Sequence, residues 1–297
     1  MSFEELKRLI YIIESSDTES SNLINGIDVI PSKIPTLDSE LQIGGIPLGC
    51  LTGIYGEPDS GKSVLSWYII KSAQELGLIP ILIDTERKLD PKYISSVGVD
   101  TDLLIITHVS KPSPLLSVCE TGLAHGAKLI VVDTITSVGF EDFYLPDSIK
   151  CFCSALCSLA ASYNASIVLL SQMRYWFLPF LPGWSSGFGT YGCAYSNILG
   201  PYTSIEICVE KGESIVKDGV TTGHIMRAEV AKNRCTNRVG EGAELDLIYG
   251  KGFDIFKDLV KLYIKQGYIT QSGPYFIYKG NRYLGFNEIS RYLKEEE

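Results

Sequence analysis

The middle of the chain alternates short apolar runs with longer stretches of helical character. The runs are rich in β-branched residues and occupy residues 51–55, 79–83, 103–107, 129–132 and 167–170. Their apolar residues stand at successive positions, so both faces of each strand are expected to be buried. Strands of this kind separated by helices predict an α/β fold with a mostly parallel central sheet flanked by helices.

The pattern changes towards both ends of the chain. Residues 204–209 and 224–231 are predicted to add antiparallel strands to the sheet, and residues 254–266 predict an amphipathic helix followed by a short aromatic stretch. We therefore predict three parts: an N-terminal helix (1–15) and polar linker within residues 1–24; a core over residues 25–248; and a small α+β C-terminal module over residues 249–297 with an acidic tail.

Composition narrows the class of protein. The 297 residues are 45% hydrophobic, enough for one α/β core with a small second module. No charge-free run of about 18 apolar residues occurs, so we expect no membrane span. The first residues mix Glu4, Glu5, Lys7 and Arg8 among apolar ones, unlike a secretory signal, so we expect an intracellular protein.

Charge and cysteine content exclude two simple functions. A net charge of −9 argues against a protein that coats nucleic acid by bulk charge, although a locally lined site needs only a few cations and stacking rings. Among eight cysteines, Cys151, Cys153 and Cys157 cluster, and zinc is the alternative to consider there. No histidine lies nearby and a fourth ligand is missing, so reduced, buried thiols are favoured.

A phosphate-binding motif follows the first apolar run. Residues 56–63 match G-x-x-x-x-G-K-[ST] in full, between a predicted strand and a helix over residues 63–76. Its backbone N–H groups and the helix N-terminus favour phosphate oxygens, so we expect Lys62 on the β- and γ-phosphates and Ser63 on Mg²⁺. The full set of expected ATP-binding residues here is Gly56, Glu57, Pro58, Asp59, Ser60, Gly61, Lys62 and Ser63.

Carboxylates stand at the ends of two other apolar runs. Asp133 directly follows the apolar run of residues 129–132 and lies about 70 residues after the phosphate-binding motif. A carboxylate at this position can hold Mg²⁺. Glu86, just after residues 79–83, is our candidate for the group that activates the attacking water. Asp84 is the competing candidate, and either carboxylate could instead be a helix cap.

These residues resemble the bacterial RecA recombinase family. The order and spacing match in the phosphate motif, in residues 83–93, at Asp133, in residues 170–174 and 232–234, and in two C-terminal stretches, residues 249–253 and 273–280. The resemblance covers roughly residues 25–285. The C-terminal match favours this family over other ATPases with the same core fold.

The resemblance implies a role for each matched residue. Tyr93 is expected to stack on adenine and Asp90 to lie near its amino group, while Gln172 senses the γ-phosphate. Lys232 and Arg234 are expected to reach the phosphates bound by a neighbouring subunit. By the same resemblance, the N-terminal helix is expected to pack on that subunit and so to serve oligomerisation. The alternatives are an ordinary half-buried helix residue for Tyr93 and solvated strand ends for the two cations.

Two segments are expected to bind DNA by the same resemblance. The first covers residues 138–149, with Lys150 opening the next helix. The second covers residues 173–197, and its long, glycine-interleaved aromatic sequence suits base stacking. A packed lid or an oligomer contact is the alternative. The candidate DNA-binding residues are Lys150, Arg174, Tyr175, Trp176, Phe177 and Gly192.

The resemblance implies an ATP- and Mg²⁺-dependent DNA recombinase of the bacterial cytoplasm. Such a protein forms a helical homo-oligomer on single-stranded DNA and exchanges strands with homologous double-stranded DNA in recombination and repair. The chain is shorter than its bacterial counterparts, its first DNA loop differs and Arg234 stands where lysine is usual, a divergence typical of a phage-encoded member. The alternatives are an accessory DNA-binding ATPase without strand exchange and a hexameric motor.

Overall fold

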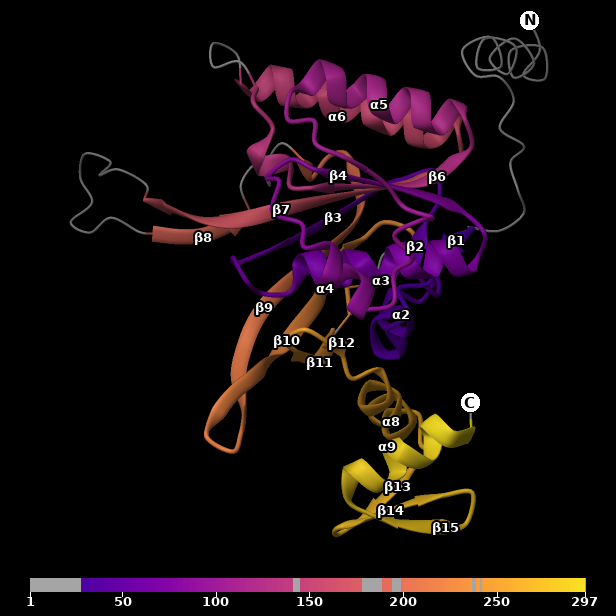
Figure 1. Cartoon of the computed structure of the whole chain (residues 1–297). Coiled ribbons are helices and arrows are strands. Elements are labelled where there is room, and N and C mark those ends of the chain that lie inside the picture. Colours follow the sequence, from indigo (N-terminus) through magenta and orange to yellow (C-terminus); the bar gives the residue numbers. More distant parts are fainter. Residues whose placement is uncertain are drawn as a thin grey trace, which may run out of the picture.

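The computed structural model describes residues 28–140, 145–177, 189–193, 199–236, 239–240 and 242–296. Its centre is a mixed, mostly parallel sheet between two layers of helices (Figure 1). The strand order is β12-β11-β10-β9-β3-β7-β6-β4-β5, and β8 pairs with β7 outside this path. The predicted α/β class is therefore correct. The N-terminal helix and linker predicted over residues 1–24 lie outside the described residues.

Six strands of the sheet run parallel, from β9 to β5 along its order. Their bounds are β3 Leu51–Gly56, β4 Ile79–Asp84, β5 Ile105–Thr107, β6 Ala127–Asp133, β7 Ser166–Phe177 and β9 Thr203–Lys217. The antiparallel strands are β8 Gly189–Cys193, β10 Val220–Asn233, β11 Ala243–Ile248 and β12 Gly252–Phe253. A separate short pair joins β1 Val29–Ile30 to β2 Ile46–Pro47.

Helices cover both faces of the sheet. Helices α2 (Pro35–Leu41) and α3 (Lys62–Glu75) lie on one face, and α5 (Pro112–Ala124) and α6 (Leu145–Ser162) on the other (Figure 1). Each face has its own apolar cluster, one containing Leu65 of α3 and the other Cys153 of α6. Successive buried residues of the central strands alternate between the two clusters, because side chains of a strand point to opposite faces. This explains why those strands are apolar throughout.

Two features of the sheet and one of a helix differ from the sequence-based expectation. The strand predicted over residues 204–209 is antiparallel to β10 but parallel to β3, so only part of that prediction was right. Strand β7 continues past residue 170 to Phe177 because its end pairs with β8, which builds a two-stranded ribbon within residues 173–197, the range predicted as the second DNA loop. Helix α6 begins at Leu145, so Lys150 lies in its second turn and not at its opening.

The C-terminal residues form a small α+β unit, as predicted. Helices α8 (Ile255–Lys265) and α9 (Gly285–Glu296) pack on a three-stranded antiparallel sheet of β13 (Thr270–Ser272), β14 (Tyr275–Tyr278) and β15 (Asn281–Leu284). Helix α8 also contacts α2, where Asp258 accepts hydrogen bonds from the backbone and the hydroxyl of Thr36 at 2.9 and 2.5 Å. The central sheet continues past residue 248 to β12.

Two smaller findings bear on the predicted class. In the part of the chain that the structure describes, no helix has both the length and the apolar character of a membrane span. The three clustered cysteines lie on α6 with different exposure: Cys151 is exposed, Cys157 half-buried and Cys153 buried. Burial raises the pKa of the Cys153 thiol to about 12, which disfavours the thiolate that zinc requires.

Candidate active site

The P-loop, residues 56–63, connects the end of β3 to the start of α3. Its two glycines have no room for a side chain: a Cβ atom on Gly56 would lie 2.0 Å from the carbonyl oxygen of Val209, and one on Gly61 2.8 Å from Met226 Sδ. Gly61 also has a φ of 101°, which glycine adopts without strain. Strands β9 and β10 therefore press directly against the loop and fix its course.

Lys62, the first residue of α3, points back over the P-loop. Its Nζ donates to the carbonyl oxygens of Gly56 at 3.0 Å and Glu57 at 2.5 Å, and lies 3.5 Å from the hydroxyl of the buried Ser60. Burial lowers the pKa of Lys62, and the charges of Asp133 and Asp59 oppose that shift. The cation is thus held, with little solvent around it, at the place where the P-loop would receive phosphate.

Ser63 and Asp133 meet beside Lys62. The Ser63 hydroxyl donates to Asp133 Oδ2 over 2.6 Å, joining the start of α3 to the end of β6. Burial raises the pKa of Asp133, while the Ser63 hydrogen bond works in the other direction. A hydroxyl and a carboxylate oxygen are the hard donors that Mg²⁺ prefers, so the pair predicted as its ligands fits that ion.

Glu86 is held by three side chains next to this pair. Its Oε1 accepts hydrogen bonds from Gln172 Nε2 and from the Ser137 hydroxyl, each at 2.9 Å. Its Oε2 accepts one from Lys88 Nζ at 2.9 Å. Burial by itself would raise the pKa of Glu86, but the hydrogen bonds from Lys88 and Ser137 outweigh it and the net pKa is lowered. The carboxylate is therefore ionised at neutral pH.

Asp84, the competing carboxylate, has a different environment. Its side chain accepts hydrogen bonds from the backbone N–H groups of Arg87 at 2.8 Å, Lys88 at 3.4 Å and Leu89 at 3.1 Å. It closes the turn after β4 that carries Glu86. The backbone-capping role considered for both carboxylates thus falls to Asp84, at a turn and not at a helix.

Two adjoining cavities open at the P-loop. One, of about 440 Å³, extends from Lys62 to Tyr93 and Tyr249, and the other, of about 240 Å³, from Lys62 to Glu86 and Gln172. They share Asp59, Lys62, Ser63 and Trp67, and Pro58 lines the second. The structure thus brings P-loop residues 58–63, Glu86, Asp133, Gln172 and Tyr93 together in the lining of these two cavities, which we call the cleft. Gly56, Glu57 and Asp90 are not among the lining residues.

Tyr93 lies half-buried on α4 (Pro91–Ser96), at the wall of the larger cavity. Its ring meets that of Trp67 edge to face, with centroids 5.0 Å apart. Asp90 is the N-cap of the same helix, and its Oδ1 accepts a hydrogen bond from the backbone of Lys92 at 2.9 Å. Both aromatic rings are suitable neighbours for a nucleobase.

Sequence reasoning did not assign several residues of this cleft to the site. Trp67, Lys211, His224 and Tyr249 all line the larger cavity, and His224 Nδ1 lies 3.2 Å from the Tyr249 hydroxyl. Trp67 could have been found, because it stands one helical turn after Ser63 and so faces the same side of α3. Lys211 and His224 come from β9 and β10, and no local signal connects them to the P-loop.

Comparisons with known proteins fit this geometry. The family model described as the RecA N-terminal domain matches residues 15–142, which include the P-loop, Glu86 and Asp133. Protein RecA of Francisella philomiragia subsp. philomiragia is 31% identical over 298 residues, covering 96% of this chain and 80% of that protein. Protein RecA of Francisella tularensis subsp. novicida is 30% identical with the same coverage. The chain belongs to the RecA family.

Membership of the RecA family supports a recombinase and ATPase function at the level of the family. The pairwise match spans 96% of the chain and so extends beyond the matched N-terminal domain to the region of Gln172 and Lys232. The two RecA relatives are bacterial, and neither supports the phage origin that the divergence of the sequence suggested.

The two cations that the RecA resemblance assigned to the neighbouring subunit lie away from the cleft of their own chain. Lys232 and Arg234 stand at and just after the end of β10, where they bond to residues 200–206. Lys232 Nζ donates to the carbonyl oxygen of Thr203 at 2.7 Å, and Arg234 Nη1 to that of Pro201 at 2.9 Å. Lys232 is half-buried, whereas Arg234 is exposed, as the alternative of a solvated strand end expects.

The predicted DNA-binding residues of this RecA-family chain occupy two places. Lys150 is exposed on α6 and pairs with Asp147 at 3.1 Å. Arg174, Tyr175, Trp176 and Phe177 form the end of β7, and Gly192 on β8 is the direct partner of Arg174. The β7–β8 ribbon projects from one side of the sheet (Figure 1).

Proposed function

We propose that this RecA-family protein is an ATP-dependent DNA recombinase. It assembles as a helical filament on single-stranded DNA and promotes pairing and strand exchange with homologous duplex DNA in recombination and repair. The observation that supports this most directly is the hydrogen bond between Glu86 and Gln172. Gln172 lies on β7, the strand that runs on to Phe177 and into the predicted second DNA loop. One strand therefore connects the phosphate end of the cleft to the candidate DNA contacts.

The P-loop end of the cleft binds the triphosphate. Backbone N–H groups of residues 59–63 and the positive end of α3 attract the phosphate oxygens, and Lys62 exchanges its carbonyl partners for them. Ser63 and Asp133 hold Mg²⁺, which neutralises charge on the phosphates when bound. The adenine stacks against Tyr93, and Asp90 at the start of α4 lies near its amino group.

Glu86 orients and deprotonates the attacking water. Its pKa is lowered, so it is ionised and ready to accept a proton, and its three hydrogen bonds fix the direction of the carboxylate. Gln172 shares Oε1 of this carboxylate with Ser137, so a change at the γ-phosphate that moves Glu86 also disturbs Gln172. The disturbance then travels along β7 to Arg174, Trp176 and Phe177.

The site of one subunit is completed by its neighbour. Lys232 and Arg234 supply positive charge to the phosphates of the adjacent subunit, which stabilises the transition state as an arginine finger does. Hydrolysis then depends on filament assembly. DNA lies along the filament, contacted by Arg174, Tyr175, Trp176 and Phe177, with Gly192 leaving space beside Arg174 and Lys150 adding a cation.

The test is ATP hydrolysis with and without single-stranded DNA, for the wild type and for Trp176→Ala/Phe177→Ala. Stimulation by DNA in the wild type and its loss in the variant are expected, since aromatic stacking contributes about 1–3 kcal/mol per base. Val216→Ala/Val220→Ala is the matched control, because these exposed apolar residues lie on another projecting hairpin, β9–β10. Hydrolysis that ignores DNA in the wild type contradicts the proposal.

A second candidate function is an accessory DNA-binding ATPase without strand exchange. The ion pair between Lys150 and Asp147 favours it, since it neutralises the cation assigned to the first DNA segment. Strand exchange between a single strand and a homologous duplex separates the two functions. DNA-stimulated hydrolysis without exchange supports the accessory protein.

A further inference from the structure

Lys232 is enclosed by one short segment of its own chain, residues 199–206, which we call the post-loop segment. Its Nζ donates to the carbonyl oxygens of Gly200 and Thr203, lies 3.3 Å from the Thr203 hydroxyl and forms an ion pair of 3.5 Å with Glu206. An ammonium group has three donors, so these acceptors occupy all of them. Lys232 can therefore reach a neighbouring subunit only after it leaves these partners.

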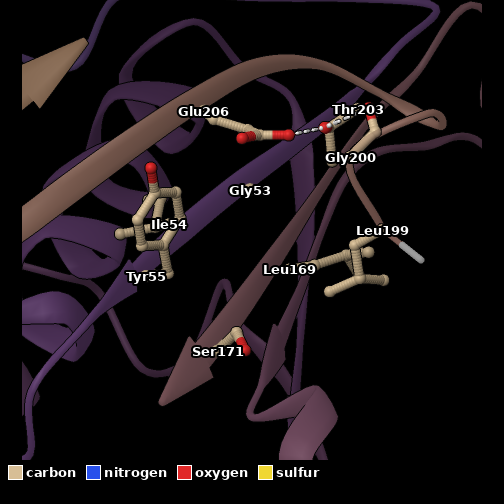
Figure 2. A pocket seen from close by; sticks show the side chains of 9 residues that line it. All are labelled: Gly53, Ile54, Tyr55, Leu169, Ser171, Leu199, Gly200, Thr203 and Glu206. Atoms are coloured by element: carbon tan, nitrogen blue, oxygen red, sulfur yellow. Dashed lines mark hydrogen bonds between the residues drawn. The ribbon is translucent and has the colours of Figure 1, made fainter. Parts of the chain in front are cut away.

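Glu206 and Lys232 are direct cross-strand partners in the β9–β10 pair. The register of that pair shifts between Val230 and Lys232, and such a bulge re-aims the side chain that follows it. Glu206 Oε1 also accepts a hydrogen bond from the Thr203 hydroxyl at 2.5 Å, drawn as the dashed line in Figure 2. Burial lowers the pKa of Lys232, and the charge of Glu206 opposes that shift.

Arg234, the second predicted trans-acting cation, is bound to the same segment. Its side chain donates to the carbonyl oxygen of Pro201 at 2.9 Å and its backbone N–H to that of Ser204 at 2.8 Å. Both cations are therefore attached to the post-loop segment, which begins two residues after the predicted second DNA loop (173–197) ends.

The post-loop segment is not tightly packed on the sheet beneath it. A cavity of about 20 Å³ lies between Leu199, Gly200, Thr203 and the strands β3 and β7, and it extends to Ser171, the residue before Gln172 (Figure 2). A space of this size holds about one water molecule. A small shift of the segment therefore need not displace the buried core of the sheet.

We propose that Glu206, together with Thr203, is a positioning residue that retains Lys232 within its own subunit until the post-loop segment moves. This inference rests on the proposed trans role of Lys232. DNA bound at the second loop shifts the segment, the acceptors of Lys232 separate, and the ammonium transfers to the phosphates bound by the neighbouring subunit. Hydrolysis without DNA is slow because the retained cation is unavailable.

The test compares ATP hydrolysis with and without single-stranded DNA in four single variants and one double variant. Glu206→Gln removes the charge that holds Lys232, and Thr203→Val removes the bridging hydroxyl while keeping the shape. Thr203→Ser restores that hydroxyl. Glu210→Gln is the matched control. Glu210 lies four residues after Glu206 on β9, on the same face of the strand, and is exposed.

Glu206→Gln and Thr203→Val are expected to raise hydrolysis without DNA by roughly three- to tenfold, the range for one partly screened ion pair or hydrogen bond. Hydrolysis with DNA changes little, so the ratio of the two rates falls. Thr203→Ser and Glu210→Gln keep the wild-type ratio, and Lys232→Gln added to Glu206→Gln abolishes the gain. If Glu206 and Thr203 only stabilised the fold, replacing them would lower the hydrolysis rates with and without DNA together.

Two results have separate meanings. A wild type whose hydrolysis ignores DNA overturns the proposed function. A second result overturns only the retention of Lys232. In it, DNA stimulates the wild type, but Glu206→Gln and Thr203→Val have the same ratio of hydrolysis rates with and without DNA as Glu210→Gln. If Glu206→Gln binds a fluorescent ATP analogue poorly, and so is misfolded, the comparison of Thr203→Val with Thr203→Ser decides alone.

Discussion

Asp84 and Glu86 stand two residues apart, and the fold uses them differently. The Asp84 carboxylate accepts hydrogen bonds from three backbone N–H groups, whereas the Glu86 carboxylate at the cleft accepts its hydrogen bonds from side chains. The sequence placed both at the end of a strand and could not choose by pattern alone, because their spacing gives no information on side-chain partners. The deciding partners of Glu86, Ser137 and Gln172, are 51 and 86 residues away.

Replacing Glu86 with Gln should separate binding from hydrolysis. The substitution keeps the size of the side chain but removes the base, so the hydrolysis rate is expected to fall by about 10²–10⁴-fold. Affinity for ATP, measured by equilibrium binding of a fluorescent analogue, should change little. Lys62→Ala serves as the contrast, since it should weaken binding itself. A Glu86→Gln protein that hydrolyses ATP at the wild-type rate would remove Glu86 from the mechanism.

At the scale of elements, apolar runs located the central strands but not their full lengths. The sequence marked residues 129–132 within β6 and 79–83 within β4, because buried strands are apolar on both faces. It ended β7 at residue 170, seven residues early, because the strand beyond that point is held by pairing with β8 across a long loop. The hydrogen-bond acceptors around Lys232 could not be predicted from the sequence either, since they include backbone carbonyl oxygens of a segment far from it along the chain.

Asp38, at the contact between α2 and α8, is expected to make the stability of the protein depend on pH. Burial raises the pKa of Asp38 on α2 from its ordinary value of 3.8 to about 6, and the nearby charge of Asp258 on α8 adds to the shift. The folded state therefore binds this proton more tightly than the unfolded state. Its contribution to stability is present below about pH 4 and is lost as pH rises through about 6.

Asp38→Asn should therefore stabilise the protein more at high pH than at low pH. Asparagine can still accept the hydrogen bond from the backbone of Ser32, now 2.8 Å long, without a buried charge. We expect a gain of about 1–3 kcal/mol in the free energy of unfolding near pH 8 and little gain near pH 4, measured by urea titration. Asp218→Asn, in the exposed β9–β10 turn, is the control and should show no such difference. Equal gains at both pH values would mean that the fold does not raise the pKa of Asp38.

At the scale of the whole molecule, the described residues place the proposed catalytic groups in two separate sets. The P-loop, Glu86, Asp133 and Gln172 surround the cleft, while Lys232 and Arg234 lie elsewhere on the same chain, bound to the post-loop segment. A monomer with this arrangement is expected to bind ATP but to hydrolyse it slowly. If Lys232 and Arg234 act in trans as proposed, the two sets are expected to meet in a head-to-tail assembly, where each subunit gives its cations to the next.

Mixing two inactive variants should restore activity if the site is shared in this way. Glu86→Gln lacks the base but keeps Lys232, and Lys232→Ala lacks the cation but keeps Glu86. In a random equal mixture, about one interface in four joins an intact Glu86 to an intact Lys232, so about a quarter of the wild-type DNA-stimulated rate is expected. Each variant alone should stay near background at the same total concentration. Mixtures that remain as inactive as their components would show that Lys232 acts within its own subunit, because no pairing of subunits could then rescue the other's defect.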